Sequence, residues 1–501
     1  METNFIGMAF VCVCVAIIVR VFHSRDLPPG PLHLLITNTI LCLLKPLPEL
    51  EPILRNLHAK YGPIITLHFL FGPIIFIADR SLAHQALIQN GAAFAHRPKF
   101  LSYKSLINDH LSITSSSYDA VWRVLRRNLT FEMLNPTRFR SFSTARKHVL
   151  DDLLNRLKFD AESNHSVKVI DHIRHAMFSL LVFICFGESV GDDHIQNIQH
   201  VHRLSIMGFS RFSVLNLLPK VVSSMLFRKR YHELLHLWKV QKDLLVPLIE
   251  KRLGKIKEDN DPNECTTYYV DTLLNLQLPK ENRKLREGEI VTLCSEFLYA
   301  GTDTTSTALE WVMANLVKHR HMQQRLVAEI GGLVGEREER EVKEEDLNKL
   351  PYLRAVILEG LRRHPPSLVL LPHAVTEDVV LNGYLVPKHV TVNFMVAEMG
   401  WDPSVWEDPM EFKPERFLGI EFDITGSKGI KMMPFGAGRR ICPAYNLAML
   451  HLEYFVANLV WNFEWKAPNG DDVDLSRKQE FTMVMKHPLQ AQICARIHTH
   501  L

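Results

Sequence analysis

Hydrophobic residues recur every three to four positions over most of this chain. That spacing places apolar side chains on one face of a helix. It predicts helices over 51–61, 119–157, 170–187, 231–259, 289–318, 320–334 and 352–364. Two short apolar runs, 64–69 and 74–77, lie on either side of Phe71-Gly72-Pro73 and predict a β-hairpin. The pattern therefore predicts a mainly α protein with a minor β portion.

The N-terminal residues form a separate apolar segment. Residues 5–19 contain no charged side chain, and an 18-residue helix would span about 27 Å of the ~30 Å hydrocarbon core. Glu2 precedes the run, whereas Arg20, His23 and Arg25 follow it, so the positive-inside rule places the body of the protein in the cytoplasm. The alternative is a cleaved signal peptide. Its positive charges would precede the apolar run, and an A-x-A cleavage site would follow.

Three regions follow from this pattern. We predict a membrane anchor over residues 1–23, a proline-rich hinge over 24–34 and a single catalytic domain over 35–501. The hinge contains Leu27-Pro28-Pro29-Gly30-Pro31, which favours a stiff, extended polyproline geometry. Chain length alone would suggest about three domains. We expect a single domain, because the motifs described below are spread from Trp122 to Cys442 and would have to form one site together. The charged stretch 337–346 is interpreted as a solvated connection.

Composition narrows the class of protein. The chain of 501 residues is 47% hydrophobic and 23% charged, which is ordinary for a globular protein. A net charge of +3 is too small to favour a nucleic-acid partner. Eight cysteines without regular spacing do not indicate a disulfide framework, so the body is expected to be reduced and to face the cytosol. The chain contains no C-x-x-C pair that would indicate zinc.

Residues 435–444 (FGAGRRICPA) set one cysteine among glycines and arginines, with a proline after it. Glycine permits tight turns, and a helix expected to begin near Tyr445 would direct its positive dipole end toward Cys442. Such a setting favours a presented thiolate with a lowered pKa. A buried structural cysteine is the alternative. The surrounding Phe435, Gly438 and Arg440 favour the thiolate.

The helix predicted over 289–318 contains an unusual polar segment, Ala300-Gly301-Thr302-Asp303-Thr304-Thr305. Glycine and hydroxyl residues are poor choices for a helix interior, and Thr can bond back to the carbonyl four residues earlier. A solvated helix face is the alternative explanation. It fits badly, because apolar residues such as Leu298 and Leu309 flank the segment.

Three further motifs are weak evidence for a function when each is taken alone. Glu359 and Arg362 are three residues apart, which makes them neighbours on a helix face, as in many surface pairs. Trp122 lies four residues before Arg126 and, taken alone, is a candidate core aromatic. Arg416 lies in Pro414-Glu415-Arg416-Phe417.

Together these motifs resemble those of the cytochrome P-450 family, in that family's order: W-x-x-x-R, A/G-G-x-D/E-T-T/S, E-x-x-R, P-E-R-F and F-x-x-G-x-R-x-C. The likeness covers essentially the whole chain. Segments 57–63, 76–87 and 125–129 are similar to the plant microsomal branch, close to plant family 89. The resemblance implies a cytochrome P-450 fold preceded by an N-terminal transmembrane helix.

The resemblance also implies roles for individual residues. Cys442 would be the axial thiolate ligand of the iron in haem b. Asp303 would pass protons inward, and Thr304 would hydrogen-bond the bound dioxygen or its water. The remaining implied haem-binding residues are Trp122, Arg126, His373, Phe435, Gly438, Arg440 and Ala444. Ala444 stands where the family usually has glycine, a departure that we interpret as tolerated. Glu359, Arg362 and Arg416 would form a buried triad that braces the haem loop.

The resemblance finally implies a single-pass enzyme of the endoplasmic-reticulum membrane with its catalytic domain on the cytoplasmic side. It would insert one oxygen atom from O₂ into a lipophilic substrate, with NADPH electrons delivered by NADPH-cytochrome P-450 reductase. Arg123, Arg127, Lys431 and Arg439 would dock the reductase or are simply solvated charges. Two alternatives stay open: a haem-thiolate isomerase or dehydratase, and a non-enzymatic haem-binding protein. The substrate itself is not predicted.

Overall fold

The computed structural model of the protein describes most of the chain. The described residues are 27–31, 50–69, 72–98, 111–163, 166–187, 190–208, 211–212, 215, 220–258, 266–279, 281–335, 337, 341–470 and 472–496. The predicted anchor, 1–23, and most of the predicted hinge, 24–34, lie outside them.

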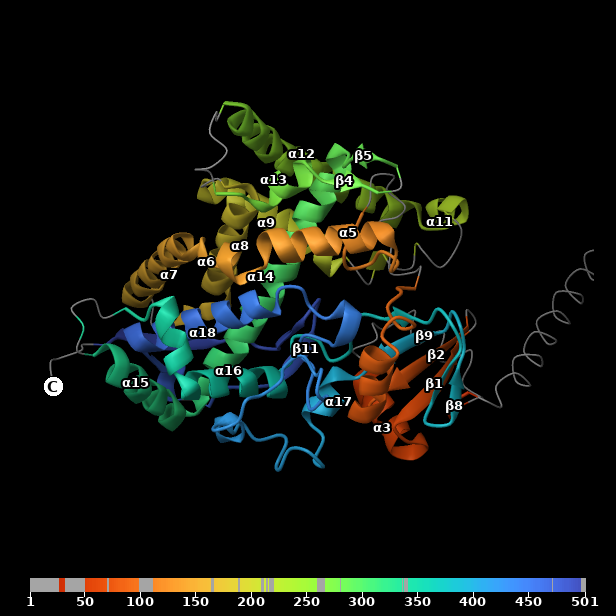
Figure 1. The fold of residues 1–501 in the computed structure, drawn as a ribbon. Helices are drawn as coiled ribbons and strands as arrows, with labels where there is room; N and C mark the ends of the chain where they lie inside the picture. Colours follow the sequence, from red (N-terminus) through yellow and green to blue (C-terminus); the bar gives the residue numbers. More distant parts are fainter. Residues whose placement is uncertain are drawn as a thin grey trace, which may run out of the picture.

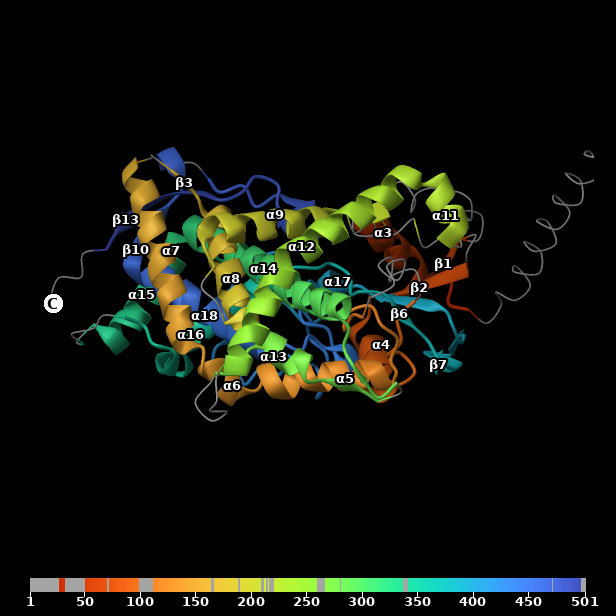
Figure 2. The same ribbon diagram turned by 90° about the horizontal axis from the view of Figure 1, so that it is seen from above.

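Helices form most of the body, as predicted (Figures 1 and 2). The longer ones are α3 (Glu51–Tyr61), α5 (Ala120–Asn128), α7 (Ser143–Ser163), α8 (Val169–Phe186), α9 (Asp192–Met207), α12 (Arg228–Glu258), α14 (Glu287–Lys318), α15 (Arg320–Val334), α16 (Pro351–Arg363) and α18 (Tyr445–Asn462). Shorter helical segments are α4 (Arg80–His84), η3 (Gln85–Gln89), η6 (Leu129–Met133), α6 (Pro136–Arg140), α11 (Lys220–Leu226), α13 (Tyr269–Leu274), η8 (Glu344–Lys349), α17 (Val396–Gly400), η9 (Pro414–Phe417), η10 (Gly438–Arg440) and η11 (Pro468–Gly470).

The β portion is small, and its four-stranded sheet lies at one end of the molecule, beside α3 (Figure 1). Its largest sheet has the order β1-β2-β9-β6, formed by Ile64–Phe69, Gly72–Ile77, Thr391–Phe394 and His373–Ala374. The predicted hairpin is confirmed: β1 and β2 are antiparallel, with Ile64 opposite Ile77. A second sheet has the order β10-β13-β3, formed by Phe463–Lys466, Gln490–Ala495 and Val167–Lys168. Two-stranded pairs join β4 (Gln277–Leu278) to β5 (Arg283–Lys284), β7 (Val379–Leu381) to β8 (Tyr384–Val386), and β11 (Arg477–Gln479) to β12 (Met483–Met485).

Helix α14 runs through the centre of the body and packs against α8, α16 and α18 (Figure 2). Gly301 makes the contact with α8 possible, because a Cβ at this position would lie 2.7 Å from Cδ1 of Leu181. Helix α8 is long and apolar enough to span a membrane, but 67% of its 18 residues are buried inside the protein. Its apolar sequence is therefore explained by packing in the core.

The structure corrects two predictions from the pattern. The periodic segment 119–157 is not one helix, because Asn135 caps a new helix, accepting a hydrogen bond from the Arg138 N–H, and Pro136 follows at its first position. The charged stretch 337–346 is not wholly solvated either. Asp346 is buried and takes two hydrogen bonds from Arg337, at 2.6 and 2.8 Å. Pairing lets a charged residue enter the interior.

Candidate functional site

The loop that carries Cys442 is held by its own backbone. The Cys442 N–H donates to the Phe435 carbonyl at 2.9 Å, and the Ile441 N–H donates to the Gly438 carbonyl at 3.1 Å. Gly438 has φ +69°, and a Cβ there would lie 1.9 Å from the carbonyl oxygen of Leu87. No other residue fits this position without moving the backbone. The loop therefore fixes the position of Cys442 three residues before α18 begins.

The surroundings of the Cys442 thiol act in opposite directions. Burial raises the pKa of Cys442, while the backbone N–H of Ala444 and the charge of Arg126 lower it. A cationic metal at the sulfur would add to the second group of effects and favour the thiolate. Ala444 has φ −100° and so lies in a region open to any residue. The backbone conformation at this position does not require glycine.

Three guanidinium groups lie close to this loop and bond to main-chain carbonyls. Arg126 donates to Ile441 at 2.6 Å. Arg440 donates to Ala95 at 2.7 Å, and Arg97 donates to Leu371 at 2.8 Å. Within the described residues, no carboxylate lies at ion-pair distance from any of the three. Burial and the charge of Arg440 lower the pKa of Arg97 to about 9, and burial and the charge of Arg126 lower that of Arg440 to about 10. The cluster thus carries uncompensated positive charge.

Trp122 and His373 are buried near this cluster and already have hydrogen-bond partners. The Trp122 indole N–H donates to the Ile113 carbonyl at 2.8 Å, and the Arg440 guanidinium lies 4.2 Å from the Trp122 ring centroid. His373 Nδ1 lies 2.6 Å from the Phe94 carbonyl oxygen, which places a proton on Nδ1. Burial, together with the charge of Arg97, lowers the pKa of His373 well below its usual value. The neutral ring then has no second proton, so donation from His373 to a propionate stays a prediction that needs a protonated ring.

Glu359, Arg362 and Arg416 lie in contact with one another. Glu359 and Arg362 are fully buried on α16 and form a bidentate pair at 2.6 and 2.7 Å. Arg416, from η9, places its Nε 3.4 Å from Glu359 Oε1. Arg362 also donates to the carbonyls of Gly400, Pro409 and Glu411. The triad therefore ties α16 to segment 400–416.

One face of α14 is open in the middle of an otherwise buried helix. Ala300 is exposed and Phe297 and Thr304 are partly accessible, whereas the turns before and after them are buried. Their spacing of three and four residues puts them on one side of the helix. The Thr304 hydroxyl donates to the Ala300 carbonyl at 2.6 Å, so its oxygen keeps lone pairs to accept a hydrogen bond on the open face.

Asp303 points away from that face toward α8 and α9. Its Oδ1 lies 3.5 Å from both Arg174 and Arg203, and Arg203 also bonds Glu480 at 2.8 Å. Burial raises the pKa of Asp303, and the two arginines oppose that change. Within the described residues, no hydrogen bond joins Asp303 or Thr304 to the Cys442 loop. The two sides meet through the packing of α14 against α18.

These residues fit a haem. Arg97, Arg126 and Arg440 are partly buried cations whose charge needs anions, and haem supplies two propionates. Cys442 offers a sulfur on a rigid loop, and a thiolate is a ligand for haem iron. The donor set therefore matches both ends of the cofactor.

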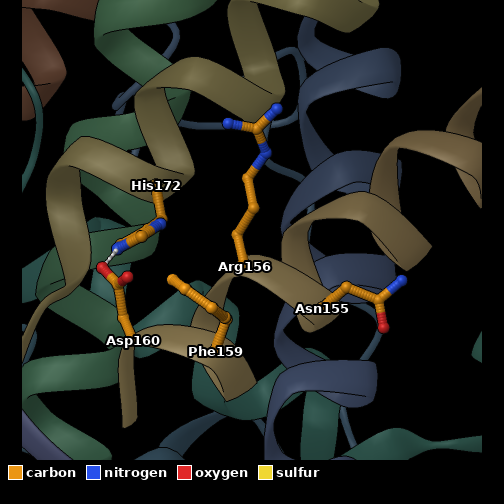
Figure 3. A pocket seen from close by; sticks show the side chains of 5 residues that line it. All are labelled: Asn155, Arg156, Phe159, Asp160 and His172. Atoms are coloured by element: carbon orange, nitrogen blue, oxygen red, sulfur yellow. Dashed lines mark ion pairs between the residues drawn. The ribbon is translucent and has the colours of Figure 1, made fainter. Parts of the chain in front are cut away.

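A surface pocket elsewhere does not belong to this constellation. It has a volume of about 370 Å³ and is lined by Asn155, Arg156, Phe159, Asp160 and His172, from α7 and α8 (Figure 3). His172 Nε2 faces Asp160 Oδ2 at 3.0 Å. None of the predicted site residues lines it.

The sequence motifs missed several of the residues found here. Arg97 was overlooked because one Arg before a Pro carries no pattern by itself. Arg174, Arg203 and Glu480 are far from Asp303 in sequence, and only the fold brings them to it.

Comparisons with known proteins agree with this geometry. The family described as Cytochrome P450 matches residues 28–495. The chain is 48% identical to Cytochrome P450 89A9 of Arabidopsis thaliana, over 95% of each chain. It is 31% identical to an isoflavone 2'-hydroxylase of Medicago truncatula, over 96% of this chain and 95% of the relative. A zebrafish cytochrome P450 solved with abiraterone superimposes with a TM-score of 0.74 at 23% identity, covering 89% of this chain and 99% of that one, a likeness of fold.

Proposed function

The chain belongs to the cytochrome P450 family, and on that premise we propose that it inserts one oxygen atom from O₂ into a lipophilic organic substrate at the endoplasmic-reticulum membrane. The family and its hydroxylase relatives make it a cytochrome P450 monooxygenase, an oxidoreductase with a haem-iron cofactor and a cysteine thiolate ligand. The observation that carries the proposal for this chain is the pairing of a rigid Cys442 loop with an open, Thr304-bearing face of α14.

We assign the haem contacts to residues of this loop and its neighbours. Cys442 would hold the iron, and Arg97, Arg126 and Arg440 would hold the propionates. Phe435, Gly438 and Ala444 shape the loop, while Trp122 orients Arg440 through ring stacking. A thiolate-ligated haem supplies the redox centre at which O₂ is activated.

Asp303 and Thr304 handle protons in this proposal. The Asp303 carboxyl is buried, with a raised pKa, and would be the group that takes up and releases the proton, while Arg174 and Arg203 hold it in place. The Thr304 hydroxyl donates its hydrogen bond to the Ala300 carbonyl, so Oγ1 is left to accept one. By accepting a hydrogen bond from a water on the open face, Thr304 would position that water to deliver a proton. An isomerase or dehydratase needs no such pair, so the pair supports the monooxygenase.

Thr304→Ala is expected to uncouple the reaction. NADPH oxidation should continue while product formed per NADPH falls about tenfold or more, because proton delivery contributes on that scale. The matched control is Thr302→Ala on the same helix. Thr302 makes the same kind of bond, to the Leu298 carbonyl at 2.7 Å, but it is buried away from the open face. The ratio of product to NADPH consumed is the measurement, and a ratio equal to that of Thr302→Ala would contradict the role of Thr304.

Electron supply and membrane attachment complete the proposal. Arg123, Arg127, Lys431 and Arg439 have exposed side chains and would attract an acidic reductase. On α11, Val222, Met225 and Leu226 are exposed next to the basic segment 228–230, a pairing that suits a lipid surface.

The reaction class is tested by isotope labelling. The protein is reconstituted with NADPH-cytochrome P-450 reductase and screened against lipophilic compounds for a Soret shift, and the compounds that shift it are incubated under ¹⁸O₂. One labelled oxygen atom per product molecule is expected. Products formed at the same rate without NADPH, or carrying no label, would overturn the monooxygenase in favour of an isomerase or dehydratase.

A further inference from the structure

A buried carboxylate on α14 remains outside the mechanism given above. Glu296 is 5% exposed, and both of its oxygens accept hydrogen bonds from one loop. Oε1 accepts from the Ser112 hydroxyl at 2.9 Å and from the Thr114 N–H at 2.6 Å. Oε2 accepts from the Ile113 N–H at 2.8 Å. Through the Glu296 carboxylate, α14 therefore holds segment 112–114 by the hydrogen-bond donors of that segment.

The acceptor groups of the same loop face two partly buried arginines, Arg440 and Arg97. The Ile113 carbonyl accepts from Arg440 Nη1 at 3.1 Å as well as from Trp122. The Thr114 carbonyl accepts from Arg97 Nε at 3.1 Å. The Ser116 carbonyl accepts from Arg440 Nη2 at 2.6 Å. Three donors and three carbonyl acceptors of a short loop are therefore set between one carboxylate and two guanidinium groups.

The peptide between Ile113 and Thr114 forms the most direct connection. Its N–H points to Glu296, and its carbonyl points to Arg440 and Trp122. A peptide dipole with its N–H on an anion and its carbonyl on a cation is stabilised at both ends, and hydrogen bonds to charged groups are the stronger ones. Turning this peptide would break both contacts at once.

We propose that Glu296 is a positioning residue for the haem propionates, which acts through loop 112–116 to fix the side chains of Arg440 and Arg97. The inference rests on the proposed function, in which these arginines hold the propionates. Glu296 itself touches neither the cofactor nor the substrate in this proposal. Its carboxylate fixes the carbonyls, and the carbonyls fix the direction in which two guanidinium groups point.

Glu296→Gln tests the proposal. Glutamine offers one acceptor oxygen where the loop needs two, and its amide N–H₂ would face loop donors. The matched control is Glu289→Gln, a buried carboxylate seven residues earlier on the same helix. Glu289 bonds Arg283 and the Arg286 N–H, and it does not contact loop 112–116. Both variants remove one buried charge from α14, and only one of them disturbs the loop.

The readouts are the rate of haem transfer from the purified holoprotein to an excess of apomyoglobin and the midpoint potential of the haem. Glu296→Gln should lose haem about tenfold faster than wild type, on the scale of one hydrogen bond to a charged group, with a shifted potential. Glu289→Gln should match wild type in both. Ser112→Ala, which removes one of the three donors, should accelerate haem loss less, in the same direction.

Haem loss from Glu296→Gln at the rate of Glu289→Gln, with an unchanged potential, would overturn the proposal. If Glu296→Gln yields no folded protein, Ser112→Ala decides: a wild-type rate and potential overturn the proposal, and faster loss supports it. A wild-type protein without a thiolate-type spectrum would instead overturn the proposed function before any variant is compared.

Discussion

Replacing Cys442 with serine is expected to abolish NADPH-dependent monooxygenation while leaving the protein folded. A serine hydroxyl stays protonated at neutral pH, so the iron would lose its anionic, electron-donating ligand. The fold should persist, because the loop is held by backbone bonds such as that from the residue 442 N–H to the Phe435 carbonyl. Turnover per protein with the reductase present is the measurement, and thermal unfolding verifies the fold.

Cys494→Ser is the matched control for this substitution. Cys494 is a free, exposed cysteine on β13, and it has no hydrogen bond to the loop around Cys442 within the described residues. The same sulfur-to-oxygen change there should leave turnover at the wild-type level. Turnover that survives in Cys442→Ser would show that another group holds the iron.

Removing the guanidinium of Arg362 is expected to have the largest effect on stability. In Arg362→Leu, buried Glu359 would lose a bidentate partner and keep only the Lys413 N–H at 2.8 Å and the longer contact to Arg416. Breaking a buried ion pair from one side costs about 3–5 kcal/mol. The three carbonyls that Arg362 serves would also lose their donor. We expect protein that is largely haem-free and that unfolds at a much lower urea concentration.

Lys413→Ala provides the comparison for that change. The side chain of Lys413 forms an exposed pair with Asp408, while its backbone N–H, which remains in the variant, bonds Glu359. Exposed pairs contribute less than about 1 kcal/mol, so haem content and the urea midpoint should stay close to wild type. An Arg362→Leu protein with the same free energy of unfolding as Lys413→Ala would contradict the bracing role of the triad.

The elements of the fold that follow from local pattern were predictable. Short stretches of sequence predict the helical period of α14, the hairpin of β1 and β2, and the start of α18 at Tyr445. The break within 119–157 was missed because its apolar period continues across Asn135 and Pro136. The apolar period indicates which side chains are buried, whereas the N-cap Asn135 and the following Pro136 determine where one helix is interrupted and the next begins.

The site divides in a similar way. Family motifs indicated Glu359, Arg362 and Arg416, and the structure brings them together. The contacts of Arg97 and Glu296 depend on tertiary approach. The position of the ring proton on Nδ1 of His373 depends on its hydrogen bond to the Phe94 carbonyl, a contact that no sequence motif predicts. No local pattern singles out Glu296, because Glu289, Glu296 and Asp303 repeat at the same spacing of seven residues on α14.

Binding of carbon monoxide to the reduced haem shows whether Cys442 holds the iron as a thiolate. The purified protein is reduced, exposed to carbon monoxide and its absorbance difference spectrum recorded, with Cys442→Ser measured alongside. We expect a strongly red-shifted, thiolate-type Soret band in the wild type and its loss in the variant. A wild-type band without the red shift, or the same red-shifted band in Cys442→Ser, would contradict it.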